Sequence, residues 1–360
     1  MNESKISTQK VEELLGGIEL YLVGGAVRDL VLGNEPKDYD YSTPNSPDEV
    51  EQAILKADRH CYAMGKKFGT IGFKYEYEPK KFEFIEITTF RSEHYTPGSR
   101  KPAVEFTTNM QADMSRRDFT INAMALHSNG ELWDEYGGQL DLQNKIVRAV
   151  GSPKQRFKED PLRILRAVRF ATKYNFEIES ETERYCKRMN WALLDISKER
   201  WVIELDKILG SENVKKGLGL LMDLELLKVI IPTLELQQNY NQNSPYHDFT
   251  LWEHTKNVVA NVPKENLNLR WAALLHDIAK PFTRTENPKG HSNYLNHDIL
   301  GAELASQVCA YLKFSKVRTD YIVEQIKNHL KPESDLKQYD DAGKKLYYTP
   351  PTQNLGFDKI

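Results

Sequence analysis

The chain has 360 residues, of which 40% are hydrophobic and 28% are charged, and its formal net charge is −3. This length suggests two or three domains, and no apolar run approaches the roughly 20 residues that a membrane span needs. The first residues, Met-Asn-Glu-Ser-Lys, lack the apolar core of a signal peptide. Three cysteines, far apart, argue against a disulfide framework or a zinc cluster, so we expect a globular protein of the reducing cytoplasm.

A glycine pair near the N-terminus is the first chemically informative feature. The apolar run 18–23 predicts a buried strand, Gly24 and Gly25 end it, and 26–32 predicts the helix that follows. Glycine lets a backbone approach a phosphate closely, and the start of a helix offers free N–H groups. Arg28 adds a charged fork one turn later. The stretch therefore predicts a phosphate-binding turn.

Two carboxylates, Asp38 and Asp40, follow this turn. If residues 38–42 form a strand, both side chains point to one face of it. Paired carboxylates beside a phosphate cradle are typical of a Mg²⁺ site for phosphoryl transfer. Gly-Gly and Asp-x-Asp are each common in ordinary turns and exposed strands, but in this order, with Arg28 between them, they favour the metal site.

This ordered pattern resembles the signature of the nucleotidyltransferase superfamily that contains DNA polymerase beta. The form Gly-Gly-x-Val-Arg-Asp followed by Asp-x-Asp is that of its class II tRNA nucleotidyltransferases and bacterial poly(A) polymerases. The resemblance implies a mixed-sheet head domain that transfers nucleotides from CTP and ATP to RNA.

The next elements predict the remainder of such a sheet. Residues 46–57 begin with Ser-Pro-Asp-Glu, a capped helix start, and residues 70–78 and 81–88 alternate as strands. Polymerase-like sites often take a third metal carboxylate from a neighbouring strand. Glu86 is the candidate for that ligand, and Glu83 is the competing one.

The segment 91–101 contains Gly, Pro and polar residues and predicts a loop. In the resembled family a flexible loop at this place assists the switch from C to A addition. The run Arg-Arg-Asp-Phe-Thr-Ile-Asn-Ala, from residue 116, then matches the family's second motif at every position. Two arginines and an aspartate suit phosphates and a ribose hydroxyl. The nucleotide-binding candidates in this run are Arg116, Arg117, Asp118 and Asn122.

From residue 155 onward the pattern becomes helical. The segment 159–170 predicts an amphipathic helix with Pro161 in its first turn. Four charged residues recur at three-residue intervals and share one face: Asp160, Arg163, Arg166 and Arg169. A carboxylate accepts from a base amino group and a guanidinium donates to a ring nitrogen, so Asp160 and Arg163 could select a base. Glu-Asp-x-x-Arg is the family motif assigned to selecting C and A, and Arg166 and Arg169 would lie nearer the triphosphate.

Basic residues gather in this part of the chain although the whole chain is slightly acidic, and such a stripe suits an RNA backbone. They are Lys145, Arg148, Lys154, Arg156, Lys158, Arg163, Arg166 and Arg169. Further on, residues 196–209 predict a helix with a Ser cap, and 213–231 predict a helical hairpin that Pro232 closes. Three residues resemble the family's fifth motif, which braces the neck: Glu199, Arg200 and Glu204.

A Gln- and Asn-rich stretch, 237–248, predicts a linker to a last domain. There, His254 precedes His276-Asp277 on an apolar segment, a pattern that resembles the HD phosphohydrolase superfamily. Those enzymes hold a divalent metal with His, His-Asp and a later Asp. His254, His276 and Asp277 are therefore metal candidates. The later Asp has no clear counterpart among Asp335, Asp340 and Asp341.

Together these features predict an α+β protein with a polymerase-beta-like mixed-sheet head, followed by an all-α neck and body and an HD-type helical domain. The expected divisions are a nucleotidyltransferase head at 1–142, a neck and body that bind nucleotide and tRNA at 143–236, an apparently incomplete HD-type domain at 245–331, and an irregular tail at 332–360.

The resemblance implies a CCA-adding tRNA nucleotidyltransferase that uses Mg²⁺, CTP, ATP and tRNA. The rivals are CC-adding, A-adding and poly(A)-polymerase relatives, an HD phosphohydrolase whose head only binds nucleotide, and a non-catalytic RNA-binding module. Residues 64–70 look like the tRNA enzymes' version of that stretch rather than the one of bacterial poly(A) polymerases.

Overall fold

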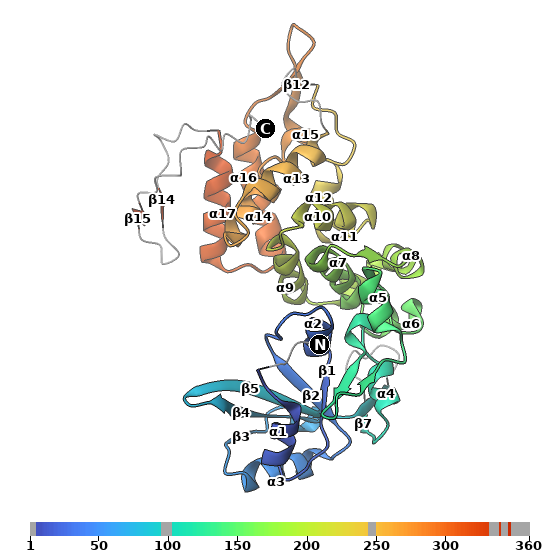
Figure 1. Ribbon diagram of the computed structural model, residues 1–360. Helices are drawn as coiled ribbons and strands as arrows, with labels where there is room; N and C mark the ends of the chain where they lie inside the picture. The colour runs from blue at the N-terminus through green and yellow to red at the C-terminus, as the bar shows by residue number, and fades with distance from the viewer. Residues whose placement is uncertain (1–4, 95–102, 244–249, 331–337, 340–344, 347–360) are drawn as a thin grey trace. The chain divides into compact units, whose positions relative to one another are not determined.

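The computed structural model describes residues 5–94, 103–243, 250–330, 338–339 and 345–346 (Figure 1). The chain packs into two units. The head unit comprises residues 1–163 and 176–185, and the helical unit comprises residues 164–175 and 186–360. A mixed sheet in the first and helices in the second confirm the α+β class, whereas the finer four-part division stays a prediction. Within the described ranges no helix combines the length and apolar character that crossing a bilayer requires.

The head unit is built on a seven-stranded sheet in the order β3-β4-β5-β2-β1-β8-β9. Its strands are β1 Tyr21–Val23, β2 Tyr39–Thr43, β3 Cys61–Tyr62, β4 Thr70–Glu78, β5 Lys81–Thr89, β8 Ala125–His127 and β9 Leu132–Trp133. Strands β2 and β5 run parallel, and the other neighbours are antiparallel. The predicted strands over 70–78 and 81–88 are confirmed. The predicted strand over 18–23 is shorter, since only its last three residues pair.

Alternation along β4 and β5 separates a buried face of the sheet from an open one. Ile71 and Phe73 on β4, and Ile85 and Ile87 on β5, are fully buried on the covered face. Helix α3, Pro47–Lys56, packs on that face against β3, β4 and β5. The residues that alternate with them in sequence, such as Lys74 and Glu86, point to the opposite, more exposed face.

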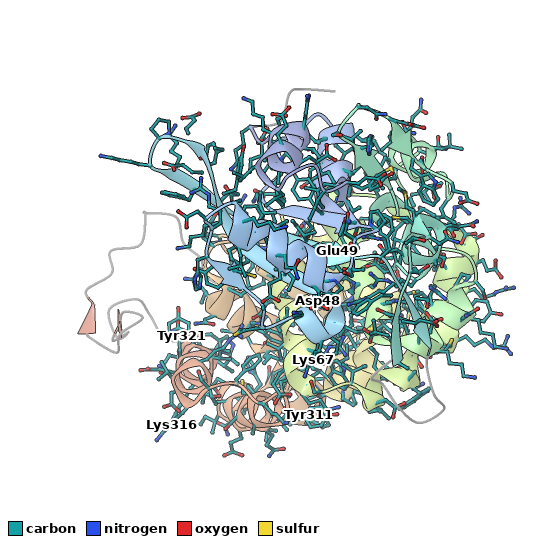
Figure 2. The ribbon with its side chains drawn as sticks, turned by 90° about the horizontal axis from the view of Figure 1, so that it is seen from below. Asp48, Glu49, Lys67, Tyr311, Lys316 and Tyr321 are labelled. Atoms are coloured by element: carbon teal, nitrogen blue, oxygen red, sulfur yellow. The ribbon has the colours of Figure 1, made fainter. Side chains whose placement is uncertain are left out.

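The predicted cap of α3 is confirmed. Ser46 Oγ accepts from the backbone N–H of Glu49, and the Glu49 carboxylate accepts from the N–H of Ser46, which forms a capping box. Asp48 and Glu49 are labelled at the start of this helix in Figure 2. The other helical segments of the head unit are α1 Thr8–Leu14, α2 Gly25–Val31, η1 Lys66–Phe68, α4 Met110–Ser115, η2 Thr120–Asn122, α5 Gly138–Gln143 and α6 Pro153–Glu159.

Two small strand pairs complete the head unit. One pairs β10 Ile146–Val147 with β11 Glu177–Ile178 in parallel, and the other pairs β6 Arg91–His94 with β7 Ala103–Phe106 antiparallel. The second pair corrects the predicted loop over 91–101, because the first four residues of that predicted loop form strand β6. Residues 95–101 of that prediction lie outside the described residues.

The helical unit consists mainly of short helices. They are α7 Leu162–Tyr174 and α8 Ser180–Arg188, which both begin in the head unit, η3 Asn190–Asp195, α9 Lys198–Leu209, α10 Val214–Asp223, α11 Leu227–Ile230, α12 Pro232–Glu235, α13 Leu251–Asn261, α14 Leu267–Leu275, α15 Lys280–Thr283, α16 His297–Tyr311 and α17 Lys316–Asn328. Two hairpins accompany them, β12 Arg284–Glu286 with β13 Ser292–Tyr294, and β14 Gln338–Tyr339 with β15 Lys345–Leu346.

Three local predictions in this region need correction. Pro161 precedes α7 and does not lie in its first turn, because Asp160 and Pro161 separate α6 from α7. Pro232 opens α12 and does not close a hairpin. Proline is tolerated there because the first turn of a helix makes no use of the backbone N–H that proline lacks. Ser197 stands at the N-cap of α9 but its hydroxyl makes no cap hydrogen bond.

The predicted linker over 237–248 is partly packed core. Gln237 is fully buried, and its side-chain oxygen accepts from the Thr255 hydroxyl at 2.8 Å. Gln242 is also buried, and its side-chain oxygen accepts from Lys280 Nζ. Two of the amides in this stretch are thus buried with partners for their side-chain oxygens, and residues 244–248 lie outside the described residues.

Candidate active site

Three predicted carboxylates gather on the open face of the head sheet. Asp40 on β2 lies directly beside Glu86 on β5 in the parallel register, so their side chains share a face. Asp38 precedes β2 by one residue and is exposed, as are the other two. Glu83 lies on the opposite face of β5, where it pairs with Lys5 at 2.8 Å. The geometry therefore favours Glu86 over Glu83 as the third carboxylate.

The electrostatics of this cluster suit a cation. Desolvation against the sheet raises the pKa of Asp40, and the like charges of Glu86 and Asp38 raise it further, while Arg117 opposes them. Clustered carboxylates repel one another unless a positive charge lies among them. Three carboxylate oxygen donors are also the ligands that Mg²⁺ prefers. The donor set thus fits a divalent metal ion.

The glycine pair brings two guanidinium groups against the backbone. Gly24 has a φ of 65°, which side-chain-bearing residues rarely adopt, and a Cβ there would lie 3.0 Å from Arg117 Nη1. A Cβ at Gly25 would lie 3.2 Å from Arg28 Nη2. The two glycines leave room for positive charge on the β1 side of β2. Phosphate binding at this turn stays a prediction, and the helix that follows it, α2, has seven residues.

A buried aspartate that the sequence did not single out as a site residue anchors both arginines of the second motif. Asp113 is fully buried, and its two oxygens accept from Arg116 at 2.6 Å and from Arg117 at 3.2 Å. Burial alone would raise the pKa of Asp113, but Arg117 and Arg116 outweigh it and the pKa lies below its ordinary value. The available signal was the spacing, since Asp precedes the arginines by three and four residues on a helix.

The remaining second-motif residues form a buried chain with Arg28. Arg28 Nη1 donates to Asn122 Oδ1, and Asn122 Nδ2 donates to Asp118 Oδ1 at 2.9 Å. Asp118 Oδ1 also accepts from the N–H of Phe119 at 2.8 Å. Three predicted site residues are thus brought together, and the amide of Asn122 orients both of its neighbours.

The two predicted base-selecting residues, Asp160 and Arg163, do not share the face of one helix, because Asp160 precedes α7. Asp160 lies in extended backbone before α7, and its Oδ1 accepts from the N–H of Leu162 at 3.1 Å. Arg163 is 8% exposed, and its fork donates to Glu159 at 2.9 Å and to the backbone carbonyl of Arg116 at 2.7 Å. Glu159 therefore fixes the Arg163 guanidinium, and base selection stays a prediction.

Arg166 and Arg169 belong to the helical unit. Arg169 Nε lies 3.1 Å from Glu204 Oε2, and its guanidinium lies 4.2 Å from the ring of Phe170. Glu204 is buried, so the predicted bracing role of this glutamate has a partner in the structure. The predicted proximity of Arg166 and Arg169 to a triphosphate stays a prediction.

The helical unit contains a second cluster of metal-ligand type. His276 Nε2 and His254 Nε2 lie 3.0 Å and 3.4 Å from Asp277 Oδ2. His297 Nε2 and His329 Nε2 lie 3.4 Å and 4.0 Å from Oδ1 of the same carboxylate. The sequence named the first three residues as ligands, and the structure adds His297 and His329. Each oxygen of Asp277 thus belongs to a group that could hold a metal ion.

The imidazoles of this cluster are oriented by backbone carbonyls. His276 Nδ1 lies 2.8 Å from the carbonyl of Ala273, and His297 Nδ1 lies 2.6 Å from that of Tyr294. These contacts orient each ring so that Nε2 faces Asp277, and in the neutral Nδ1–H tautomer Nε2 is the atom that a metal would bind. The geometry of these two histidines therefore fits a metal centre.

Lys280 supplies a positive charge to this cluster. Its Nζ lies 2.7 Å from Asp277 Oδ2, and its side chain is buried. Burial would raise the pKa of Asp277, but His276 and Lys280 outweigh it and hold that pKa well below its ordinary value. The candidates for the later Asp of the HD pattern, Asp335, Asp340 and Asp341, lie outside the described residues.

Comparison with known proteins agrees with this arrangement. Residues 20–148 match the family model described as the poly A polymerase head domain. Residues 175–237 match a probable RNA and SrmB binding site of polymerase A, and residues 250–355 match an HD domain. The three matched families follow the order of the motifs along the chain.

The similar relatives are CCA-adding enzymes. The chain is 36% identical to that of Staphylococcus haemolyticus over 254 residues, 70% of this chain and 60% of the relative, and 38% identical to that of Bacillus pumilus over 240 residues, 64% and 56% of the two chains. It thus spans about 60% or less of the length of these relatives.

Solved structures of CCA-adding enzymes share the fold. The crystal structure of the Bacillus stearothermophilus enzyme in complex with CTP has a TM-score of 0.56 and 28% identity, covering 89% of this chain and 77% of that one. A CCA-adding enzyme in complex with ATP has a TM-score of 0.62 and 25% identity, covering 92% and 73%. With its motifs, fold and domain matches in agreement, this chain carries a poly A polymerase head domain and its probable RNA-binding region, followed by an HD domain, and it is similar to CCA-adding enzymes.

Proposed function

We propose that the protein is a CCA-adding tRNA nucleotidyltransferase, which transfers CMP, CMP and AMP from CTP and ATP to the 3′ end of tRNA without a nucleic-acid template. The observation that carries this proposal is the row of Asp40 and Glu86, with Asp38 beside it, next to the glycine pair and its two guanidinium groups. The relatives that are CCA-adding enzymes, and the structural neighbours that bind CTP and ATP, support it.

In this reaction the 3′ hydroxyl of the RNA attacks the α-phosphorus of the nucleotide, the bond to the bridging oxygen breaks, and pyrophosphate leaves. A divalent metal ion, which we propose is Mg²⁺, would stabilise the developing charge on both oxygens. Asp38, Asp40 and Glu86 would hold it. Arg28 and Arg117 would bind the phosphates, and Asp113 keeps Arg117 in position.

The experiment that tests this function uses purified protein, tRNA that lacks its 3′ end, and each labelled nucleoside triphosphate in turn. CMP alone, and AMP after CMP, should be incorporated, and UMP and GMP should not. No incorporation from any nucleotide would reject the proposal.

Base selection gives a prediction of its own. Ionised Asp160 only accepts hydrogen bonds and Arg163 only donates, an order that cytosine and adenine match and uracil and guanine do not. We expect Asp160→Ala and Arg163→Ala to reduce discrimination against UTP and GTP by about tenfold or more. Competition assays with four nucleotides measure it.

Glu159→Gln provides the companion variant, because it loosens the Arg163 fork without removing either base-contacting group. We expect a smaller loss of discrimination in this variant than in Arg163→Ala. If all three variants transferred more slowly but kept the parental base preference, Asp160 and Arg163 would have a structural role and would not select the base.

A second candidate function is metal-dependent phosphoester hydrolysis at the histidine cluster, favoured by the four imidazoles around Asp277. We expect Mn²⁺ alone to raise the unfolding temperature of the protein by several degrees, because it binds only the folded state. His276→Ala should remove this shift, and His291→Ala, outside the cluster, should keep it. A shift that persists in His276→Ala would contradict the metal assignment.

Nucleotide addition should not depend on this cluster. We expect His276→Ala and Asp277→Ala to leave transfer to tRNA largely intact in preparations that remain folded. Loss of transfer in a folded variant would show that the cluster belongs to the transfer site or to tRNA binding.

The three cysteines are free, and we propose a cytoplasmic location on that basis.

A further inference from the structure

The open face of the head sheet carries aromatic side chains next to the three carboxylates. The register places four residues in one row across adjacent strands, Asp40, Glu86, Gly72 and Tyr62. Gly72 leaves a gap in this row, and the ring of Phe84 fills it, because a Cβ at Gly72 would lie 2.5 Å from Phe84 Cζ. The rings of Tyr62 and Phe84 lie 5.4 Å apart at 70°. We call these two side chains the aromatic shelf.

The aromatic shelf remains open to solvent. Phe84 is 43% exposed and Tyr62 is 39% exposed, whereas Ile85, the next residue on β5, is fully buried on the other face. An aromatic ring often covers a glycine in a sheet, and that accounts for the position of Phe84. Cover alone needs only an apolar side chain, however. Tyr62 also contacts the ring of His60, with centroids 4.6 Å apart. Adjoining, partly exposed rings beside a polar site are what a flat ligand uses for stacking.

The strand order decides which substrate can reach the aromatic shelf. In the sheet, β1 lies on one side of β2, and β5, β4 and β3 lie on the other. Gly24, Gly25 and the Arg117 guanidinium, proposed to bind the triphosphate, are on the β1 side. In-line transfer places the attacking oxygen opposite the leaving pyrophosphate. The 3′ end of the RNA should therefore approach from the β5 side, where the aromatic shelf lies.

The size of a nucleotide supports the same placement. Neighbouring strands are about 4.8 Å apart, so the Phe84 ring, over Gly72, begins about one strand spacing from Glu86. A nucleotide whose 3′ hydroxyl lies at the carboxylates has its base one ribose away from them. Lys74 faces Phe84 in the register and is exposed, and its ammonium group could contact the phosphate of that nucleotide.

We infer that the aromatic shelf stacks the last unpaired base at the 3′ end of the RNA and so holds the 3′ hydroxyl at the carboxylates; this inference rests on the proposed function. Stacking tolerates every base, because each has a π face. The same shelf can therefore accept each new 3′ end after a round of addition. Phe84 and Tyr62 are positioning residues for the RNA and take no part in selecting the incoming nucleotide.

The test compares the KM for tRNA lacking its 3′ end with the KM for CTP. We expect Phe84→Ala to raise the KM for RNA by about 5- to 100-fold and to leave the KM for CTP unchanged. Phe84→Trp should behave as the parent. Phe84→Leu, which still covers Gly72 but cannot stack, should behave as Phe84→Ala. Phe82→Ala is the matched control, since Phe82 is 53% exposed on the same strand face but farther from Glu86.

A binding measurement separates this inference from the proposed function. RNA with 2-aminopurine as its last base should lose fluorescence on the parent protein and keep it on Phe84→Ala, whether or not transfer occurs. If the parent quenches the probe but adds no nucleotide, the proposed function fails and the stacking inference survives. A parental KM for RNA in Phe84→Leu, or equal losses in Phe82→Ala, would overturn the inference, as would a dimer of the parent that Phe84→Ala dissociates.

Discussion

Asp40→Asn is expected to lower nucleotide transfer by about 1,000-fold or more while the protein stays folded. Asp40 lies on the exposed face of the sheet beside Glu86, so the change removes a metal-binding charge without opening the core. Single-turnover transfer of CMP to tRNA lacking its 3′ end measures the rate, and thermal unfolding measures the fold. Asp38→Asn should behave in the same way.

Glu83→Gln is the matched control, because Glu83 is on the same strand as Glu86 but on the opposite face of the sheet, where it pairs with Lys5. This variant should transfer at the parental rate, and Glu86→Gln should be slower. If Asp40→Asn transferred nucleotides within a few-fold of the parental rate, the carboxylates would have no role in the mechanism.

Asp113→Asn is expected to have the largest effect on stability. Its carboxylate is fully buried and neutralises Arg116 and Arg117, so the change leaves two guanidinium groups without their shared anion. We expect a loss of about 3–5 kcal/mol in the free energy of unfolding. A weaker grip on the triphosphate should accompany it, seen as a raised KM for CTP. Urea denaturation and steady-state kinetics measure the two effects.

Asp48→Asn offers a control with the same contact length. Asp48 lies 2.6 Å from Lys66 Nζ, as Asp113 does from Arg116, but its side chain is 75% exposed. Exposed pairs of this kind contribute about 0–1 kcal/mol, so little stability should be lost. Equal losses in both variants would mean that burial of Asp113 has no special role.

The lowered pKa of Asp113 also predicts a pH dependence. The folded-state pKa lies below the ordinary value, so the stabilisation by this carboxylate is present above an ordinary pKa of about 4 and is lost as the pH falls through the folded-state pKa. The difference in unfolding free energy between the parent and Asp113→Asn should therefore shrink under acid conditions. A difference that stays constant down to strongly acid pH would contradict the assigned cause.

Sequence patterns predicted the elements that depend on local chemistry. The alternation over 70–78 and 81–88 predicted β4 and β5, and Ser-Pro-Asp-Glu predicted the capped start of α3. Glu86 and Glu83 lie on opposite faces of β5, and the choice between them depended on the register in which β5 pairs with β2. That pairing joins residues 46 positions apart, and no local pattern specifies it, so only the fold could decide in favour of Glu86.

Other features of the site depend on partners that are distant in sequence. In the sequence little distinguishes Asp113 from the other acidic residues, and its role follows only from its burial against two arginines. Base selection by Arg163 stays a prediction, and the carbonyl of Arg116 to which its fork donates lies 47 residues away in the sequence. The register that places Phe84 over Gly72 beside Glu86 is likewise a property of the folded sheet.

The most direct test of the proposed function is the length and sequence of the product when tRNA lacking its 3′ end is incubated with both CTP and ATP. We expect an extension that stops after three nucleotides with the sequence C, C, A, although no template is present. A product that stops after two cytidines, gains a single adenosine, or grows into a long A tail would contradict the proposed specificity. No extension at all would contradict the assignment as a nucleotidyltransferase.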